Sequence, residues 1–174
     1  MSKIYRLFLV LSILLGSEFV TADLTELENR IIAISERDKE SAIELLAKTV
    51  NINSGTMNHS GVKAVGDIFA KEFQSLGLKT SWYDMQEVNR AGHLFAETTP
   101  ESANRCLLLI GHLDTVFEAD SPFQTFERQG DHATGPGVND MKGGDVVILY
   151  ALRALKEVGV LDELNLIVAL IGDE

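Results

Sequence analysis

Apolar residues recur at helical spacing in three parts of the chain, and each part ends at a turn signal. The stretches are residues 24–50, 62–76 and 141–158. Gly77 and Gly159 follow the second and third stretches, and glycine is the residue that most often follows the last turn of a helix. The spacing therefore predicts three amphipathic helices.

The first helical stretch has its own start signal and one ambiguous region. Thr25 and Glu28 stand at the spacing of a capping box, which predicts that the helix begins there. The charged residues 35–40 either interrupt this helix or continue it. Residues 51–60 are rich in Asn, Ser and Gly, and this composition predicts a loop before the second helix.

Shorter apolar runs predict the strands. Residues 78–83 and 93–98 look like strands, and residues 123–128 suit an edge strand. The runs 106–110 and 164–171 are almost continuously apolar, which is typical of strands buried on both faces. The third helix lies between these two runs, so they form a β-α-β unit with parallel strands. The predicted fold class is α/β, with a mixed, largely parallel sheet flanked by helices.

Charge and cysteine content narrow the functional classes. The 174 residues include 26 Asp and Glu against 15 Lys and Arg, a formal net charge of -11. This charge argues against binding to nucleic acid and against adsorption to anionic membranes, because both need a basic surface. One cysteine excludes a disulfide framework and a multi-cysteine zinc module within the chain. We expect Cys106 to be a small buried apolar residue.

The first 22 residues have the pattern of a secretory signal peptide. Lys3 and Arg6 precede a short apolar run, and the segment ends with the small residue Ala22. The run is too short for a membrane-spanning helix, which needs about 20 apolar residues. We therefore expect cleavage after Ala22, export to the periplasm or the medium, and no stable membrane association afterwards; an uncleaved anchor is the alternative. Residues 23–174 then form the folded part.

Polar side chains follow the two runs that predict buried strands. His112 and Asp114 come directly after the first run, Glu174 follows the second, and Asp140 stands where a glycine-rich loop meets the third helix. In open α/β sheets, ligands collect beyond the carboxyl ends of the strands, so His112, Asp140 and Glu174 should meet at one edge. Imidazole and carboxylate groups together suit zinc.

Spacing also suggests a role for each group. His112 and Asp114 are two positions apart and project to the same side of an extended segment, so the carboxylate can hold the ring nitrogen not used for metal. Asp140 at a helix start can bind cations through both oxygens, and Glu174 can act as a general base.

Each of these residues also has an ordinary structural interpretation. His112 with Asp114 can form a local hydrogen bond, Asp140 can cap the helix, and Glu174 can be a solvated terminus. The other histidines lack an acidic partner in a comparable frame and are interpreted as surface or loop residues, namely His59, His93 and His132.

The order of these motifs resembles a known family. The similarity is to the co-catalytic zinc metallopeptidases of the glutamate carboxypeptidase and aminoacylase family, which includes acetylornithine deacetylase and succinyl-diaminopimelate desuccinylase. Its three metal motifs look like Gly-His-Leu-Asp-Thr-Val-Phe at 111–117, Gly-Pro-Gly-Val-Asn-Asp-Met-Lys-Gly-Gly at 135–144, and Gly-Asp-Glu at 172–174. Residues 46–56 also resemble a loop of the glutamate carboxypeptidase branch.

The resemblance implies roles, a cofactor and a reaction. It implies that His112 binds one zinc ion, that Asp114 orients His112, and that Asp140 bridges two zinc ions. Glu174 would be the general base that activates the attacking water. Cobalt or manganese could replace zinc at such a site. The implied reaction is hydrolysis of an amide bond beside a free carboxylate in a peptide or N-acyl amino acid, for example with release of glutamate.

The sequence also departs from the family pattern. The third motif normally continues with a second Glu that binds zinc, and a further acidic ligand, a distant His and a smaller lid domain with dimer contacts normally follow. We therefore expect an N-terminal fragment of the catalytic domain, with two of the metal ligands and no turnover alone. Three alternatives remain: a non-catalytic remnant that binds a partner, an unrelated α/β binding domain, and, within the family, a deacylase or dipeptidase.

Overall fold

The computed structural model describes residues 23–99 and 105–174. The predicted signal peptide lies outside these residues. None of the described helices has the length and apolar character required to cross a bilayer.

The three predicted helices are all present. They are α2 (Glu26–Val50), α3 (His59–Ser75) and α4 (Lys142–Glu157), with short 3-10 turns η1 (Gln86–Val88) and η2 (Leu161–Glu163). α2 begins with the predicted capping box: the Thr25 hydroxyl accepts from the Glu28 amide, and the Glu28 carboxylate accepts from the Thr25 amide. The charged stretch at 35–40 continues the helix. Arg37 in this stretch donates to Glu157 of α4 and so joins the two helices.

The main sheet has four strands in the order β1-β2-β6-β3. They are β1 (Lys79–Met85), β2 (Arg90–Glu97), β3 (Leu107–His112) and β6 (Leu166–Ile171). β3 and β6 are parallel, as the β-α-β pattern predicts, whereas β2 pairs antiparallel with both β1 and β6. The α/β class and the mixed sheet are confirmed. The described sheet is less parallel than expected, because β2 enters it through a tight connection from β1.

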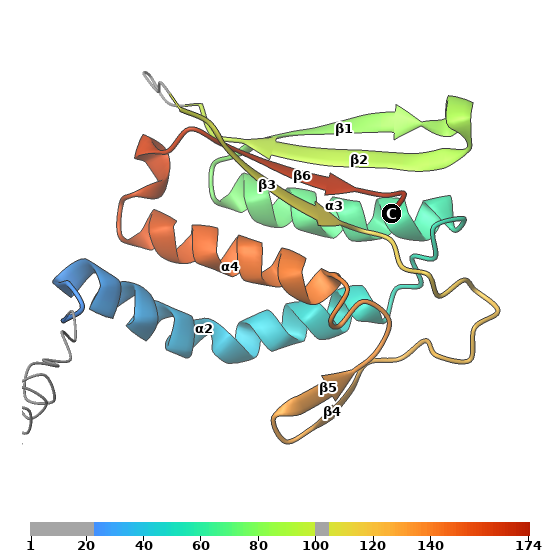
Figure 1. Cartoon of the computed structure of the whole chain (residues 1–174), viewed down its shortest axis with the longest axis horizontal. Helices are drawn as coiled ribbons and strands as arrows, with labels where there is room; N and C mark the ends of the chain where they lie inside the picture. Colours follow the sequence, from blue (N-terminus) through green and yellow to red (C-terminus); the bar gives the residue numbers. More distant parts are fainter. Residues whose placement is uncertain (1–22, 100–104) are drawn as a thin grey trace, which may run out of the picture.

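The predicted edge strand at 123–128 is wrong in its position. Only Glu127–Gln129 forms a strand, β4, and it pairs with β5 (His132–Thr134) in a separate two-stranded hairpin. The turn between them contains Gly130, whose φ of 61° suits glycine. The hairpin lies beside α2, away from the main sheet (Figure 1).

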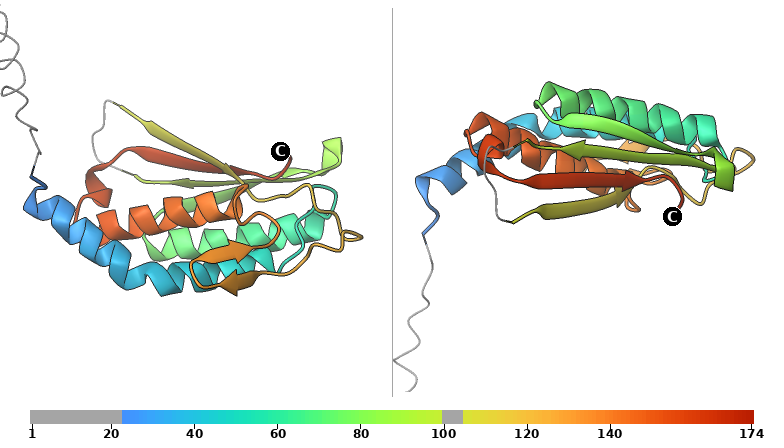
Figure 2. Two further views of the ribbon diagram at one scale, coloured as in Figure 1. Left: turned by 60° about the horizontal axis from the view of Figure 1, so that its bottom comes forward. Right: turned by 90° about the horizontal axis from the view of Figure 1, so that it is seen from above.

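The helices and the sheet form layers. Figures 1 and 2 show α2, α3 and α4 on one side of the main sheet, with α3 under β1 and β2 and α4 under β3 and β6. The core lies between these layers because each element turns its apolar side inward. Its buried side chains include Val62, Val65, Phe69, Phe73, Leu94, Ala96, Leu149, Leu152, Leu166, Val168 and Leu170.

The expected burial of residues 106–110 is also wrong. Leu108 and Ile110 are 53% and 59% exposed, and Cys106 is exposed as well. In the described part of the chain, β3 is an edge strand whose single neighbour is β6, and no helix covers the face of the sheet opposite α4. Helices therefore pack against one face of this apolar strand only.

The layered arrangement brings the sequence motifs together. Because β3 and β6 run parallel, their carboxyl ends lie at the same edge of the sheet, at His112 and Ile171. α4 begins at this edge, and the α2–α3 connection passes along it, where Gly55 forms a bridge with Thr115.

Candidate metal centre

His112 and Asp140 are adjacent although 28 positions separate them. The ring Nε2 of His112 lies 3.0 Å from Oδ1 of Asp140. His112 is the last residue of β3 and is buried, whereas the Asp140 side chain is 84% exposed and extends from the loop before α4. α4 is capped by Met141 without a side-chain hydrogen bond, so Asp140 does not cap the helix. Its carboxylate is free to act at the site.

Asp114 holds the other side of the His112 ring, as the sequence predicts. Nδ1 of His112 lies 3.1 Å from the backbone carbonyl oxygen of Asp114 and 3.5 Å from its Oδ1. The Asp114 carboxylate is itself buried, and its Oδ2 accepts a 2.6 Å hydrogen bond from the Thr56 hydroxyl. This arrangement fixes the ring and leaves Nε2 for Asp140 or for a metal.

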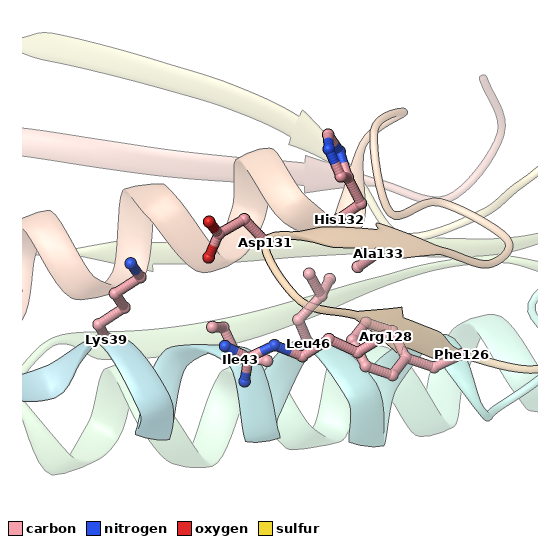
Figure 3. A pocket seen from close by; sticks show the side chains of 8 residues that line it. All are labelled: Lys39, Ile43, Leu46, Phe126, Arg128, Asp131, His132 and Ala133. Atoms are coloured by element: carbon pink, nitrogen blue, oxygen red, sulfur yellow. The ribbon is translucent and has the colours of Figure 1, made fainter.

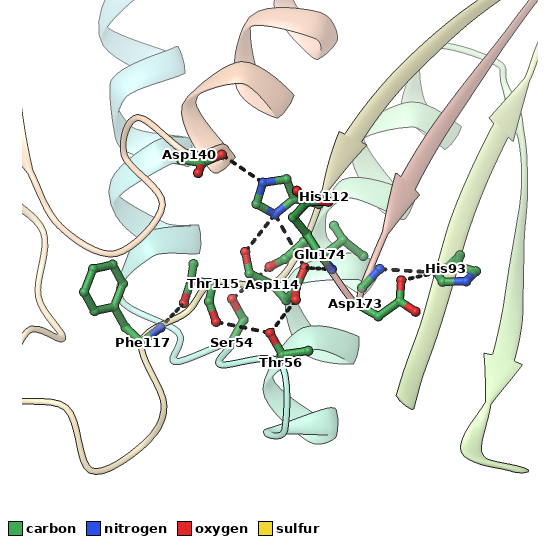
Figure 4. Close-up of polar contacts among 12 residues, drawn as sticks. Ser54, Thr56, His93, His112, Asp114, Thr115, Phe117, Asp140, Asp173 and Glu174 are labelled. Atoms are coloured by element: carbon green, nitrogen blue, oxygen red, sulfur yellow. Dashed lines mark hydrogen bonds and ion pairs between the residues drawn. The ribbon is translucent and has the colours of Figure 1, made fainter. Parts of the chain in front are cut away.

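Glu174 lines a cavity that also contacts His112 and Asp140. Its amide donates to Oδ1 of Asp114 at 3.2 Å, so the backbone after β6 is tied to the segment after β3 (Figure 4). The cavity has a volume of about 400 Å³, and its lining includes His112, Asp114, Asp140 and Glu174. The structure thus brings together all four residues that the sequence singled out.

Hydrogen bonds and burial change the charge states at the site. The contact with Asp114 makes the largest contribution to raising the pKa of His112 to about 9, partial burial opposes it, and Asp140 adds to the rise. Burial of Asp114 opposes its ionisation, but hydrogen bonds from His112 and Thr56 and from the Glu174 amide together keep its pKa below the usual value. Without a metal, His112 is therefore a cation between two carboxylates.

A second buried pair lies behind the site in the first turn of α4. Burial lowers the pKa of Lys142 to about 8 and raises the pKa of Asp145 to about 8. Lys142 donates to the carbonyl oxygens of Thr49 and Ile52, whereas both Asp145 oxygens lack a hydrogen-bond partner among the described residues. Asp145 is therefore held in its neutral form near neutral pH.

The donor atoms fit part of a zinc site. An imidazole nitrogen and a carboxylate oxygen meet at the edge of a cavity, and the rest of the imidazole is held by Asp114, which is how proteins hold a zinc-binding histidine. Within residues 23–99 and 105–174, no three or more His, Cys, Asp or Glu side chains converge as metal ligands. His112 and Asp140 are the two donors expected here, and a catalytic zinc needs more.

Sequence reasoning missed several residues around the site. Thr56, from the loop after α2, donates to Asp114 of the first motif. Lys142 belongs to the second motif, but its partners, the carbonyl oxygens of Thr49 and Ile52, are 93 and 90 positions away, so no local pattern identifies its role. His93, expected to lack an acidic partner, has Nδ1 3.9 Å from the Asp173 carboxylate and accepts from the Gly172 amide. These partners directly follow β6, which pairs with β2 only in the folded sheet.

Another cavity, of about 200 Å³, lies between α2 and the β4–β5 hairpin. Its lining includes Asp131 and His132, which are neighbours in sequence (Figure 3). Arg128 at its edge is paired with Glu40 of α2. The cavity is separate from the site at His112 and contains none of the residues of the three motifs.

Comparisons with known proteins agree with the motifs. Residues 108–174 match peptidase family M20/M25/M40. Carboxypeptidase G2 of Pseudomonas sp. (strain RS-16) is 32% identical over 154 residues, which are 85% of this chain and 36% of that protein. The chain thus spans about a third of the length of this relative.

Solved structures show the same fold. Human carnosine dipeptidase 1 superimposes with a TM-score of 0.70 at 18% identity, covering 84% of this chain and 34% of that chain. A Zn-dependent exopeptidase from Parabacteroides distasonis gives 0.53 at 18% identity, covering 75% of this chain and 45% of that chain. The family match at residues 108–174 contains all three motifs, which lie at one edge of this fold, so the chain is similar to peptidase family M20/M25/M40 at each of its expected metal motifs.

Proposed function

We propose that the whole protein carrying this chain is a zinc-dependent, carboxypeptidase-like hydrolase that cleaves an amide bond beside a free carboxylate. The observation that supports this most is the 3.0 Å contact between His112 Nε2 and Asp140 Oδ1 beside a cavity that Glu174 also lines. The similarity to carboxypeptidase G2 supports the carboxypeptidase assignment. A peptide or an N-acyl amino acid is the proposed substrate, with glutamate as one candidate for the released residue.

In this proposal, each residue has one task. His112 and Asp140 would hold the zinc, and Asp114 keeps the His112 ring in place. Zinc supplies a Lewis acid that polarises the carbonyl of the bond to be cleaved. The Glu174 carboxylate takes a proton from the attacking water and passes it to the leaving amine. The Thr56 hydroxyl donates to the buried Asp114 carboxylate and so helps to hold it against the imidazole.

The test is a set of variants of the whole protein. His112→Ala should reduce the zinc content measured by elemental mass spectrometry, and Glu174→Gln should retain zinc but lose hydrolysis of N-acyl glutamates and dipeptides. His132→Ala, in the separate hairpin, is the matched control and should change neither. Unchanged zinc content and turnover in His112→Ala would show that the residues at this edge are structural, as in an unrelated binding domain.

We also propose that the protein is exported, on the basis of the basic start and short apolar run of residues 1–22. Expression with the natural N-terminus, followed by N-terminal sequencing of the mature protein, tests this. A mature chain that begins at Asp23 outside the cytoplasm is expected. A cytoplasmic protein that retains residues 1–22 would contradict export.

A further inference from the structure

Lys142 is buried without exposed surface, although lysine rarely is. It is the first residue of α4 and stands two positions after Asp140. Its ammonium donates to the carbonyl oxygen of Thr49 at 3.0 Å and to that of Ile52 at 3.1 Å. A buried ammonium is retained only where such partners offset the loss of hydration, so these two bonds define where Lys142 must lie.

The partners of Lys142 belong to the end of another helix. α2 ends at Val50, and the last carbonyl groups of a helix lack partners within it and carry the negative end of its dipole. A cation is favourable there, whereas it is unfavourable at the start of its own helix, α4. The burial of Lys142 is therefore explained by attachment to α2, and the local requirements of α4 do not explain it.

The side chain of Lys142 also holds the loop that carries Asp140. A β-carbon at Gly137 would lie 3.0 Å from Cγ and Cδ of Lys142, so the loop backbone packs directly on the lysine stem. The amide of Gly143 donates to the carbonyl oxygen of Gly137 at 3.2 Å and closes the loop around it. Through Lys142, the Asp140 loop is fastened to the end of α2.

The residues that follow α2 contact the other metal motif. The Ser54 hydroxyl donates to the carbonyl oxygen of Leu113 at 2.8 Å, and the Thr115 amide donates to that of Ser54 at 2.8 Å. The Thr56 hydroxyl donates to Asp114 at 2.6 Å. Residues 49–56, which we term the connecting segment, therefore contact the His112 motif directly and the Asp140 motif through Lys142.

We propose that the connecting segment sets the separation of His112 and Asp140, and that Lys142 is the positioning residue that attaches the Asp140 loop to this segment. The functional meaning of this inference rests on the proposed role of both residues as zinc ligands. The test of the positioning role measures the relative position of His112 and Asp140 in the metal-free protein. The positioning role can therefore fail while the proposed zinc binding holds, and the reverse is also possible.

The first experiment compares Lys142→Met with Lys156→Met in the purified, metal-free chain. Both substitutions remove an ammonium from α4, but Lys156 pairs with Asp162 on the far side from the site. The imidazole ¹⁵N resonances of His112 report its contact with Asp140. We expect Lys142→Met to shift the Nε2 resonance and to weaken Co²⁺ binding about 10-fold or more, as loss of supporting contacts does at other metal sites. Lys156→Met should leave the His112 signals unchanged.

A folded Lys142→Met chain with unaltered His112 resonances would overturn the proposal, because a purely structural lysine would lower stability without moving this contact. Hydrogen exchange of the unmodified chain gives a second test that does not need the variant to fold. The hydrogen bonds donated by the amides of Gly143, Thr115 and Asn51 should break in one common opening event. The protection factors of these three amides against exchange should therefore agree within about threefold. Exchange of Gly143 independently of Asn51 would also overturn it.

Discussion

Gly111 lies directly against the carboxylate of Asp145, so that a β-carbon at position 111 would overlap Oδ1 of that side chain. Gly111 precedes His112 in β3, and Asp145 stands in the first turn of α4. The absence of a side chain at 111 therefore allows the strand that carries His112 to approach the helix that follows Asp140.

Substitution Gly111→Ala should destabilise the fold. The new methyl group would also meet Leu170 at 2.9 Å, and Asp145 is too buried to move aside, so we expect a loss of about 1–3 kcal/mol in urea unfolding. Gly144→Ala is the control, because its methyl group would meet only the flexible end of Met141 and the change raises helix propensity. Equal effects of the two substitutions would contradict this account.

Asp145→Asn should stabilise the protein near neutral pH. Burial raises the pKa of Asp145 to about 8 from an ordinary value of 3.8, so the folded state keeps a proton that the unfolded state loses. The bound proton contributes fully to the free energy of unfolding below pH 3.8, and this contribution is lost as pH rises towards 8. The free energy of unfolding then falls by at most about 1.4 kcal/mol per pH unit. Asparagine does not titrate, so the stability of the Asp145→Asn variant does not fall with pH for this reason.

The measurement is urea unfolding of both proteins between pH 5 and 6.5. In this range His112, whose pKa is raised from 6.5 to about 9, stays protonated in the folded state, and Lys142, with a folded pKa of about 8, is charged in both states. The stability of the unmodified chain should fall relative to that of Asp145→Asn as pH rises. Parallel pH profiles would mean that Asp145 is ionised in the folded protein.

The helices could be predicted because their signals are local. Thr25, Glu28 and the glycines after α3 and α4 mark helix ends through contacts within one turn, and the apolar stripes have a single period. The sequence left open whether residues 35–40 continue α2. The structure answers this through Arg37, whose partner Glu157 is 120 positions away.

The environment of β3 could not be predicted, because a run of apolar residues indicates a strand without specifying its neighbours. Leu108 and Ile110 suggest a strand buried on both faces, but burial depends on what packs against the strand. Similarly, Cys106 was expected inside and is exposed. Strand position in the sheet is a property of the whole fold.

The site was predictable where the chemistry follows strand ends. His112 ends β3, Asp114 follows β3 and Glu174 follows β6, and the parallel pairing of these strands brings the three residues together. Thr56, Lys142 and Asp145 were not found, because their importance comes from contacts with residues that are distant in sequence. Thr56 and Asp145 lie outside the three metal motifs, and Lys142 lies inside the second, where its position in the sequence does not reveal its partners.

Thr56→Val should destabilise the fold by removing the donor to a buried carboxylate. Oδ2 of Asp114 accepts the Thr56 hydroxyl at 2.6 Å, and Asp114 is buried, so we expect a loss of about 1–3 kcal/mol. Thr80→Val is the matched control: its hydroxyl accepts from Gln74 at an exposed position, and the change should stay within about 0.5 kcal/mol. Chemical denaturation measures both, and a negligible Thr56 effect would show that water replaces the hydroxyl.

The purified 174-residue chain should show no peptidase turnover, even with added zinc. His112 and Asp140 are the zinc donors expected at the site, and within residues 23–99 and 105–174 no group of three or more donors converges, so the donors are fewer than a catalytic zinc needs. Assays with N-acyl glutamates and dipeptides measure this directly, with the whole protein as the positive control. Turnover that depends on His112 in the chain alone would contradict it.

The open side of β3 should make the isolated chain self-associate. Leu108 and Ile110 are exposed on an edge strand that has one neighbour in the described part of the chain, and exposed apolar edges recruit further strands. Ile110→Lys places a charge on this strand and should reduce association, measured by sedimentation at several concentrations. Val88→Lys is the control, because Val88 is equally exposed but lies in η1. If both variants reduce association equally, the effect comes from net charge and the edge of β3 is not its cause.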